Sequence, residues 1–325
     1  MRRAVALWAL LFAVYAAGVG AQLSTAETRQ LHVIAGLADD RTLDAASDVR
    51  LGPGLGLLAA PAYALGGRLA VQLWLAALTA LGFVAAVSLA RRLVPDPWAT
   101  GGVLAVGLSP PAVIGATTIT AYGAGAAAIT GAAAIALSAR EEPLPRLTAW
   151  AGVLLGTLPW LAYRLCAPGL VVLAAMFRWT RRRSRALAGL VGAEIALFST
   201  VLYVSVNDKL YGGLTPSPPT WRPRFTDPSV ALLWRAPVLV LTLAAVWLLW
   251  RSRRGGLRRV LDSQVDVEVA AIFLLAICAV GALLFVPVLP CAAALAAWSL
   301  RRFPRTGAAL AAVTLAATVY TLIAG

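Results

Sequence analysis

Apolar residues along this chain come in long continuous runs, and short segments between the runs carry most of the charged residues. A helix rises ~1.5 Å per residue, so ~20 apolar residues cross a hydrocarbon core of ~30 Å. Eleven candidate spans follow from this pattern, at residues 4–20, 69–90, 98–115, 123–138, 148–163, 165–177, 187–206, 231–250, 268–286, 288–300 and 307–324. The pattern therefore predicts an all-α integral membrane protein with about 11 (10–12) transmembrane helices.

Composition supports the same fold class. The chain is 60% hydrophobic with a mean hydropathy of +0.81, and only 13% of its residues are charged, whereas soluble domains average about 25% charged residues. The sequence has no evident repeat, heptad or low-complexity linker. We therefore predict a single transmembrane domain over residues 1–325, with no soluble domain.

The net charge of +14 reflects topology. Nineteen of the 28 basic residues lie at the N-terminus or in every second connecting segment, at 91–97, 139–147, 178–186, 251–267 and 301–306. Cytoplasmic loops carry such an excess of arginine and lysine. The pattern predicts a cytoplasmic N-terminus, and it does not favour nucleic acid as a partner.

The first 22 residues, MRRAVALWALLFAVYAAGVGAQ, have two interpretations. A basic start, an apolar run and small residues before Gln22 are typical of a cleaved signal peptide, and cleavage would leave ten spans. The length of the apolar run favours a retained first span. In either case the following loop, residues 21–67, is expected outside the cytoplasm.

This first external loop holds five of the 14 acidic residues. Leu31, Ile34, Ala35 and Ala38 recur at helical spacing, which predicts a juxtamembrane amphipathic helix on the membrane surface. That helix would begin near Glu27 and end near Asp39 and Asp40, beside the only histidine, His32. The segment 50–68 that follows is rich in glycine and proline, so we expect it to be juxtamembrane or re-entrant.

Two further external segments carry polar residues. The stretch YRLCAPG is expected to form an outer turn that contains Arg164, and a second external loop over residues 207–230 would contain Lys209 and Tyr211. Arg29, Arg68 and Arg235 are expected at the same headgroup level. Arginines there could bind a lipid phosphate while a carboxylate acts as a general base. The alternative is that the acids are only solvated, the arginines only snorkel, and Glu27 only complements a helix dipole.

Glu194 is the one acidic residue well inside an apolar run, about 10 Å from its inner end. A charge at the bilayer centre costs about 2.5–3.5 kcal/mol on insertion scales. We expect this carboxylate to face protein and to have a partner, or to extend toward Arg185. A role in a proton relay is the alternative.

The layout resembles the GT-C-type membrane glycosyltransferases. AETRQL followed by LADDRTLD is similar to that family's acidic first loop, LGGRLAVQLW resembles the entry into its second span, and VNDKLYGGLTP resembles a turn after a middle span. The resemblance implies a bacterial cytoplasmic membrane enzyme that takes a sugar from a polyprenyl-phosphate carrier. It would transfer the sugar to an envelope glycan, lipid or protein on the extracytoplasmic face.

The resemblance also implies roles for residues at matching positions. Glu27, Asp39 and Asp40 would be the catalytic carboxylates, and the lipid phosphate would be bound by Arg29, Arg68, Arg164, Lys209, Tyr211 and Arg235. It assigns no metal ligands, although Mg²⁺ or Mn²⁺ could position the acceptor.

The sequence departs from the family pattern at Ala26, where the first carboxylate of an acidic pair is expected. It also lacks a late Gly-Pro-Arg-type external element. Three hypotheses therefore stay open: an active glycosyltransferase, a catalytically degenerate membrane partner that keeps the scaffold, and a transporter of lipids or solutes.

Overall fold

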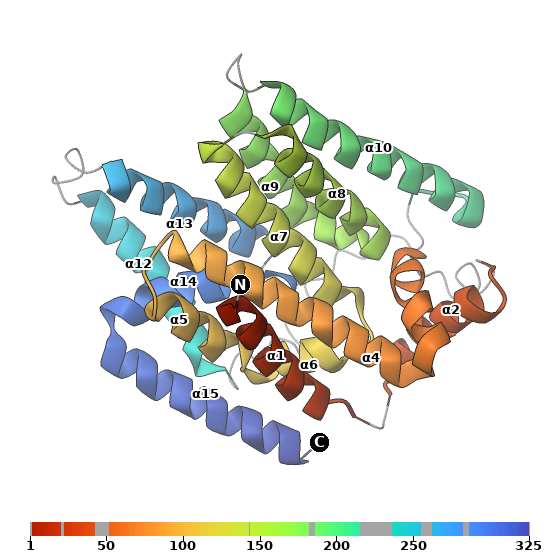
Figure 1. Ribbon diagram of the computed structural model, residues 1–325, viewed down its shortest axis with the longest axis horizontal. Coiled ribbons are helices and arrows are strands. Elements are labelled where there is room, and N and C mark those ends of the chain that lie inside the picture. Colours follow the sequence, from red (N-terminus) through yellow and green to blue (C-terminus); the bar gives the residue numbers. More distant parts are fainter. Residues whose placement is uncertain are drawn as a thin grey trace.

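The structure is a computed structural model that describes residues 2–20, 23–42, 52–142, 144–181, 186–214, 236–254, 262–281 and 286–324. Every element over these residues is helical (Figure 1), which confirms the predicted all-α class. The helices are α1 (Arg2–Ala17), α2 (Thr25–Asp39), α4 (Gly54–Arg91), α5 (Trp98–Gly107), α6 (Pro110–Thr117), α7 (Ala121–Glu141), α8 (Pro145–Leu161), η1 (Tyr163–Leu165), α9 (Cys166–Thr180), α10 (Ala186–Tyr211), η2 (Pro237–Leu239), α12 (Val240–Arg254), α13 (Asp262–Gly281), η4 (Val286–Val288), α14 (Leu289–Arg302) and α15 (Pro304–Ala324).

Each of the eleven predicted spans contains a helix, but their number as membrane crossings is not confirmed. Among the described residues, four helices are long and apolar enough to cross a membrane: α4, α7, α10 and α15. The predicted span 98–115 is two helices, α5 and α6, which meet at an angle of 62°. Pro110 and Pro111 explain the break, since proline supplies no N–H to continue the hydrogen bonding of the preceding helix.

The segment 50–68, expected to be juxtamembrane or re-entrant, is described from residue 52 onward, and its placement relative to a membrane stays a prediction. From Gly54 onward it is helical, and it runs into the following span as one helix, α4, that is interrupted at Gly66 and Gly67. Gly67 has φ of +59°, a left-handed conformation that glycine adopts without steric cost. The two glycines thus let residues 54–65 take a direction different from that of the rest of α4.

The first predicted span, α1, packs into the protein core. The side chains of Leu11 and Tyr15 are fully buried, and the Tyr15 hydroxyl donates a hydrogen bond to the carbonyl of Gly107 at 2.8 Å. The Trp8 indole N–H donates to the carbonyl of Ala77 at 3.1 Å. These contacts join α1 to α4 and α5.

Small residues bring the helices of the core close together. A Cβ atom on Gly102 would overlap the backbone of Ala297, and one on Gly152 would overlap the carbonyl oxygen of Gly192. Such contacts are typical of helices in membranes, where close van der Waals packing drives association. They join α5 to α14 and α8 to α10, and α14 is buried along most of its length.

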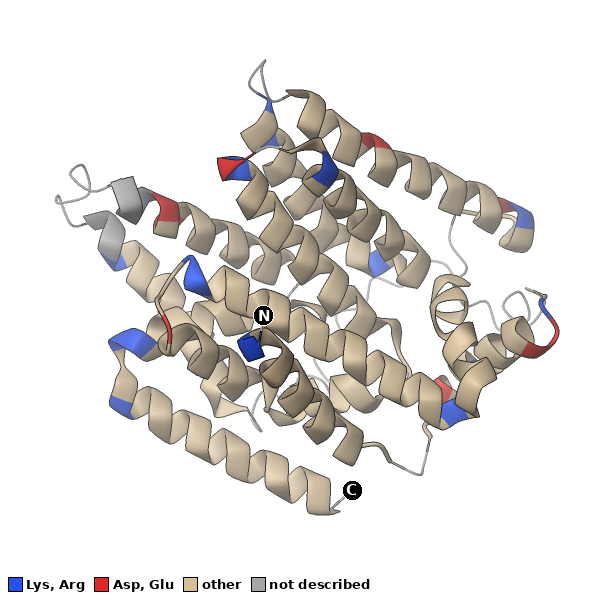
Figure 2. Ribbon diagram, viewed as in Figure 1, with Lys and Arg blue, Asp and Glu red and all other residues tan. Residues whose placement is uncertain are grey.

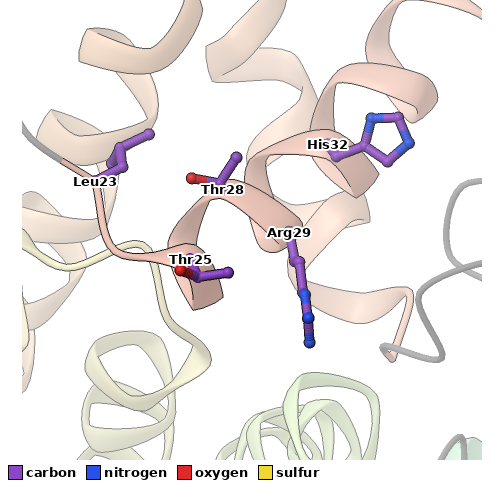
Figure 3. A pocket seen from close by; sticks show the side chains of 5 residues that line it. All are labelled: Leu23, Thr25, Thr28, Arg29 and His32. Atoms are coloured by element: carbon purple, nitrogen blue, oxygen red, sulfur yellow. The ribbon is translucent and has the colours of Figure 1, made fainter.

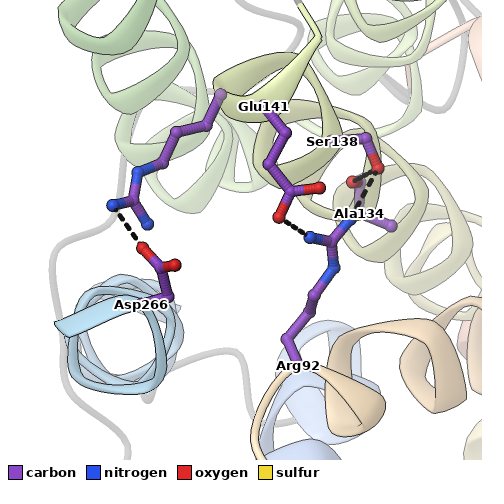
Figure 4. A network of polar contacts seen from close by, with 6 residues as sticks. Arg92, Ala134, Ser138, Glu141 and Asp266 are labelled. Atoms are coloured by element: carbon purple, nitrogen blue, oxygen red, sulfur yellow. Dashed lines mark hydrogen bonds and ion pairs between the residues drawn. The ribbon is translucent and has the colours of Figure 1, made fainter. Parts of the chain in front are cut away.

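Figure 2 shows that most arginines gather at one end of the helices. We call this the arginine-rich end; it contains the start of α1, the loop between α4 and α5, and the ends of α7, α9 and α14. Ion pairs join its elements: Arg92 with Glu141, and Arg140 with Asp266 at 2.8 Å (Figure 4). The opposite end contains α2 and the start of α7, and we call it the α2 end. The segregation agrees with the charge pattern of the sequence.

Candidate functional site

The helix predicted in the first loop is present as α2, and its sequence explains where it begins. Ser24 is the N-cap residue, and its hydroxyl accepts a hydrogen bond from the Glu27 amide at 3.3 Å. In return, Oε2 of Glu27 accepts the Ser24 amide at 2.9 Å and the Ser24 hydroxyl at 2.7 Å. This is a capping box, which the Ser-x-x-Glu spacing indicates in the sequence.

The second oxygen of the Glu27 carboxylate joins α2 to a distant segment. Oε1 accepts the backbone N–H of Ile119 at 3.0 Å, in the turn between α6 and α7. Glu27 is 9% exposed, so its charge lies almost entirely inside the protein. Both oxygens of the carboxylate therefore accept hydrogen bonds within the protein.

The apolar side of α2 is covered by protein rather than lying on a bare membrane surface. Ile34 is fully buried in a cluster with Leu55 and Val71 of α4 and with Ile119. The opposite side of α2 lines a cavity of about 430 Å³, the α2 pocket (Figure 3), bordered by Leu23, Thr25, Thr28, Arg29 and His32. The last four recur at i, i+3, i+4 and i+7, so one helix face presents two hydroxyls, a guanidinium and an imidazole. These groups suit a phosphate.

Asp39 and Asp40 lie at the other end of α2, and both are exposed. Twelve residues of helix separate Asp39 from Glu27, which corresponds to ~18 Å. The predicted catalytic carboxylates are therefore not brought together into one acidic pair.

Arg68 follows the glycine break in α4 and donates a hydrogen bond to the carbonyl of Gly20. This contact ties α4 to the chain four residues before the N-cap of α2. Arg68 thus helps to fix the position of the segment that leads into α2. Its side chain also makes at least one other polar contact.

Arg164 lies in η1, the turn predicted between two short helices. Its Nε donates to the Tyr163 hydroxyl at 3.2 Å, and this bond, together with the Tyr122 hydroxyl, raises the pKa of Arg164 above its usual value. The guanidinium is thus held between two phenols at the start of α7 and in η1. Tyr122 and Tyr163 were not predicted as site residues.

The start of α4 lies against the last turn of α8, because a Cβ on Gly54 would overlap the carbonyl of Trp160. Trp160 in turn stacks edge-on against Tyr203 of α10, with ring centroids 5.6 Å apart. The α2 end therefore brings together the start of α4, the end of α8 and α10, which are separate in the sequence.

Lys209 and Tyr211 lie on the last turn of α10, which continues four residues past the predicted start of the second external loop. Lys209 is exposed and Tyr211 half-buried. Beside them Asn207 is fully buried; its Nδ2 donates to the carbonyl of Leu214 at 3.3 Å, while its Oδ1 has no partner among the described residues. Arg235 lies outside the described residues, as does most of that loop.

Glu194 does not face protein as expected. It is exposed on α10 and has no ion pair with any described residue, while the exposed side chains of Leu190, Leu197 and Phe198 surround it along the helix. The helix α10 packs along one side only, chiefly on α8 and α9, and position 194 falls on its uncovered side. Arg185, the expected partner, lies outside the described residues.

The predicted carboxylates do not form a donor set for a divalent cation. Both oxygens of Glu27 accept hydrogen bonds, and Asp39 and Asp40 lie at the far end of α2. Across the described residues, no three His, Cys, Asp or Glu side chains come together in a way that suits a metal ion.

No protein-family model matches the chain, and no curated protein matches it in sequence. A solved structure is similar in fold: ArnT from Cupriavidus metallidurans in the apo state, with a TM-score of 0.63 and 18% sequence identity. The match covers 94% of this chain and 61% of that chain, so this chain spans about three fifths of the length of ArnT. ArnT is a GT-C glycosyltransferase. The similarity to ArnT confirms the expected GT-C-like fold and says nothing about activity.

Proposed function

We propose that this chain is a GT-C-type glycosyltransferase of the bacterial cytoplasmic membrane. It would transfer a sugar from a polyprenyl-phosphate carrier to a cell-envelope acceptor, with the α2 end facing the extracytoplasmic space. One observation carries the proposal: over 94% of its length the chain has the fold of ArnT. The buried carboxylate of Glu27 on α2 is the proposed base.

In this mechanism the acceptor hydroxyl attacks the anomeric carbon of the donor sugar. A bond forms between the acceptor oxygen and that carbon, the bond from the carbon to the phosphate oxygen breaks, and the acceptor proton passes to Glu27. Negative charge grows on the departing lipid phosphate. Arg164, which contacts Tyr163 and also Tyr122 just after the Ile119 turn, would stabilise that charge. Arg29 of the α2 pocket is a second proposed cation. Lys209 and Arg235 complete the proposed set, and Asp39 and Asp40 would contact the acceptor.

A second candidate is a non-catalytic membrane partner that keeps the scaffold. The engagement of both Glu27 oxygens favours it, because the carboxylate then acts as a cap and a tether. Ala26 in place of a first acid favours it as well.

The two candidates are separated by incubating the purified chain with a radiolabelled polyprenyl-phosphate-sugar, with and without Mg²⁺ or Mn²⁺. Release or transfer of sugar by the native chain, lost in Glu27→Gln, supports the enzyme. The amide of Gln still accepts the Ile119 N–H, so the fold should be kept. Ser24→Ala is the matched control, since it weakens the cap and keeps the carboxylate. Binding of the donor without turnover by the native chain would support the non-catalytic partner.

A further inference from the structure

The arginine-rich end contains a cavity of about 610 Å³ that the proposed function does not use. It is lined by Arg2, Arg3, Ala4, Arg91 and Asp96, and we call it the Arg2 cavity. Its volume is in the range of small-ligand sites, ~300–1,000 Å³. Three arginines and one aspartate give its lining a formal charge of +2.

Asp96 neutralises one arginine and holds it in place. Its Oδ2 binds Arg91 at 2.8 Å, while its Oδ1 accepts the Thr100 hydroxyl at 2.8 Å and the Thr100 amide at 3.3 Å. Asp96 therefore caps the start of α5 and fixes Arg91 at the edge of the cavity. About half of the Arg91 side chain stays exposed, which leaves N–H groups for a ligand.

Arg2 and Arg3 have no such partner. Neither side chain forms an ion pair or hydrogen bond with any described residue, and both are exposed. They also stand on the first turn of α1, where the helix dipole favours negative charge and disfavours cations. An anion in the cavity would satisfy both arginines and the dipole at once.

The surface of α1 next to the cavity indicates what kind of anion fits. Val5 is 60% exposed and Leu10 48% exposed, and Leu10 lies eight residues beyond Arg2, or ~12 Å along the helix. An anion with apolar chains could place its charge at the arginines and its chains along these residues.

We propose that the Arg2 cavity binds the phosphate headgroup of an anionic phospholipid from the leaflet at the arginine-rich end. Arg2, Arg3 and Arg91 donate charge-assisted hydrogen bonds to the phosphodiester oxygens, and Val5 and Leu10 contact an acyl chain. Basic pockets at helix ends in this part of a membrane suit such headgroups.

The test titrates the purified full-length chain in detergent with phosphatidylglycerol or phosphatidylcholine and counts bound lipid by native mass spectrometry. The native chain should prefer phosphatidylglycerol, and Arg2→Gln/Arg3→Gln should raise its Kd by about tenfold. The matched control is Arg301→Gln/Arg302→Gln, a second exposed arginine pair at the same end that does not line the cavity. Equal loss in both double variants, or no loss in the first, would overturn the proposal.

Two further arms complete the test. Arg91→Gln leaves the N-terminal arginines in place, so it tests the cavity even if the double variant fails to insert into the membrane. This variant too should weaken phosphatidylglycerol binding. Inorganic phosphate and glycerol phosphate, added as competitors at millimolar concentration, should leave the lipid bound. Displacement by either at the affinity of the lipid would identify a soluble phosphate ligand and refute the lipid.

Discussion

Ser24 and Glu27 each bind the other's backbone amide, and this reciprocal cap is where α2 begins. The carboxylate that the proposed mechanism uses as a base is therefore also a structural element of the helix that carries it. The two roles make separable predictions, because Ser24 can be removed without removing the charge.

Ser24→Ala should lower the free energy of unfolding by about 1 kcal/mol, the usual effect of losing an N-cap side chain. The measurement is chemical or thermal unfolding of the purified chain, followed by tryptophan fluorescence. Thr25→Ala, one residue further on, removes a hydroxyl that caps nothing and should change stability little. Equal losses in the two variants would contradict the capping role.

Gly67→Ala should destabilise the chain by about 1 kcal/mol or more, since φ of +59° is costly for any residue with a Cβ. Gly101→Ala is the control: it lies within α5, and a Cβ there would meet no neighbour. The control should gain ~0.5–1 kcal/mol from helix propensity. Unfolding midpoints of the two variants in one detergent give the comparison, and a neutral Gly67→Ala would argue against the break in α4.

Gly152→Ala should separate α8 from α10, because its methyl group would overlap the carbonyl of Gly192. Overpacking of this kind costs about 1–3 kcal/mol. The backbone cannot yield as a flexible side chain can. Gly131→Ala, which would meet only the end of the Leu154 side chain, should be tolerated much better. Similar melting temperatures for both variants would show that α8 and α10 do not approach this closely.

Glu194→Leu should raise stability in a lipid bilayer, because it replaces a charge on the uncovered face of α10 by an apolar group. The upper limit is about 2.5–3.5 kcal/mol, the insertion cost of a central charge. Asp208→Leu, at the exposed end of the same helix, is the comparison and should have a smaller effect. A loss of stability in Glu194→Leu would reveal a partner for the carboxylate.

Asp96 should make stability pH-dependent. The Thr100 hydroxyl, and after it Arg91, lowers the pKa of Asp96 below its usual value. A lowered pKa means that the contribution is present above the unfolded pKa, about 3.9, and is lost as pH falls through the folded pKa. The melting temperature of Asp96→Asn should therefore lie below that of the native chain at pH 7, and the difference should shrink below about pH 4. A difference that is constant with pH would refute this role.

The helices were predictable from the sequence because each follows from a continuous apolar run, which depends only on local composition. The breaks within the helices were harder to predict. Gly66 and Gly67 end the segment that was expected to be juxtamembrane or re-entrant, and the direction of residues 54–65 before this break depends on their packing on α2. The Ser24 cap could have been found from its Ser-x-x-Glu spacing.

The candidate site was only partly predictable, since its geometry depends on contacts between distant segments. Nothing local in AETRQL indicates that Glu27 binds the Ile119 amide, or that Tyr122 and Tyr163 enclose Arg164. The exposure of Glu194 was mispredicted for the same reason: which side of α10 is covered depends on where α8 and α9 pack.

The bond from Glu27 to Ile119 also sets an order for biogenesis. The two residues are 92 positions apart, so at ~5–20 residues per second the ribosome makes Ile119 about 5–18 s after Glu27. Until then α2 has left the ribosome but lacks its final partner. Its apolar side, with Ile34, can meanwhile pack on Leu55 and Val71 of α4, which are made before Ile119. The docking of α2 is thus a late event of assembly, completed only after the turn before α7 has reached the same side of the membrane.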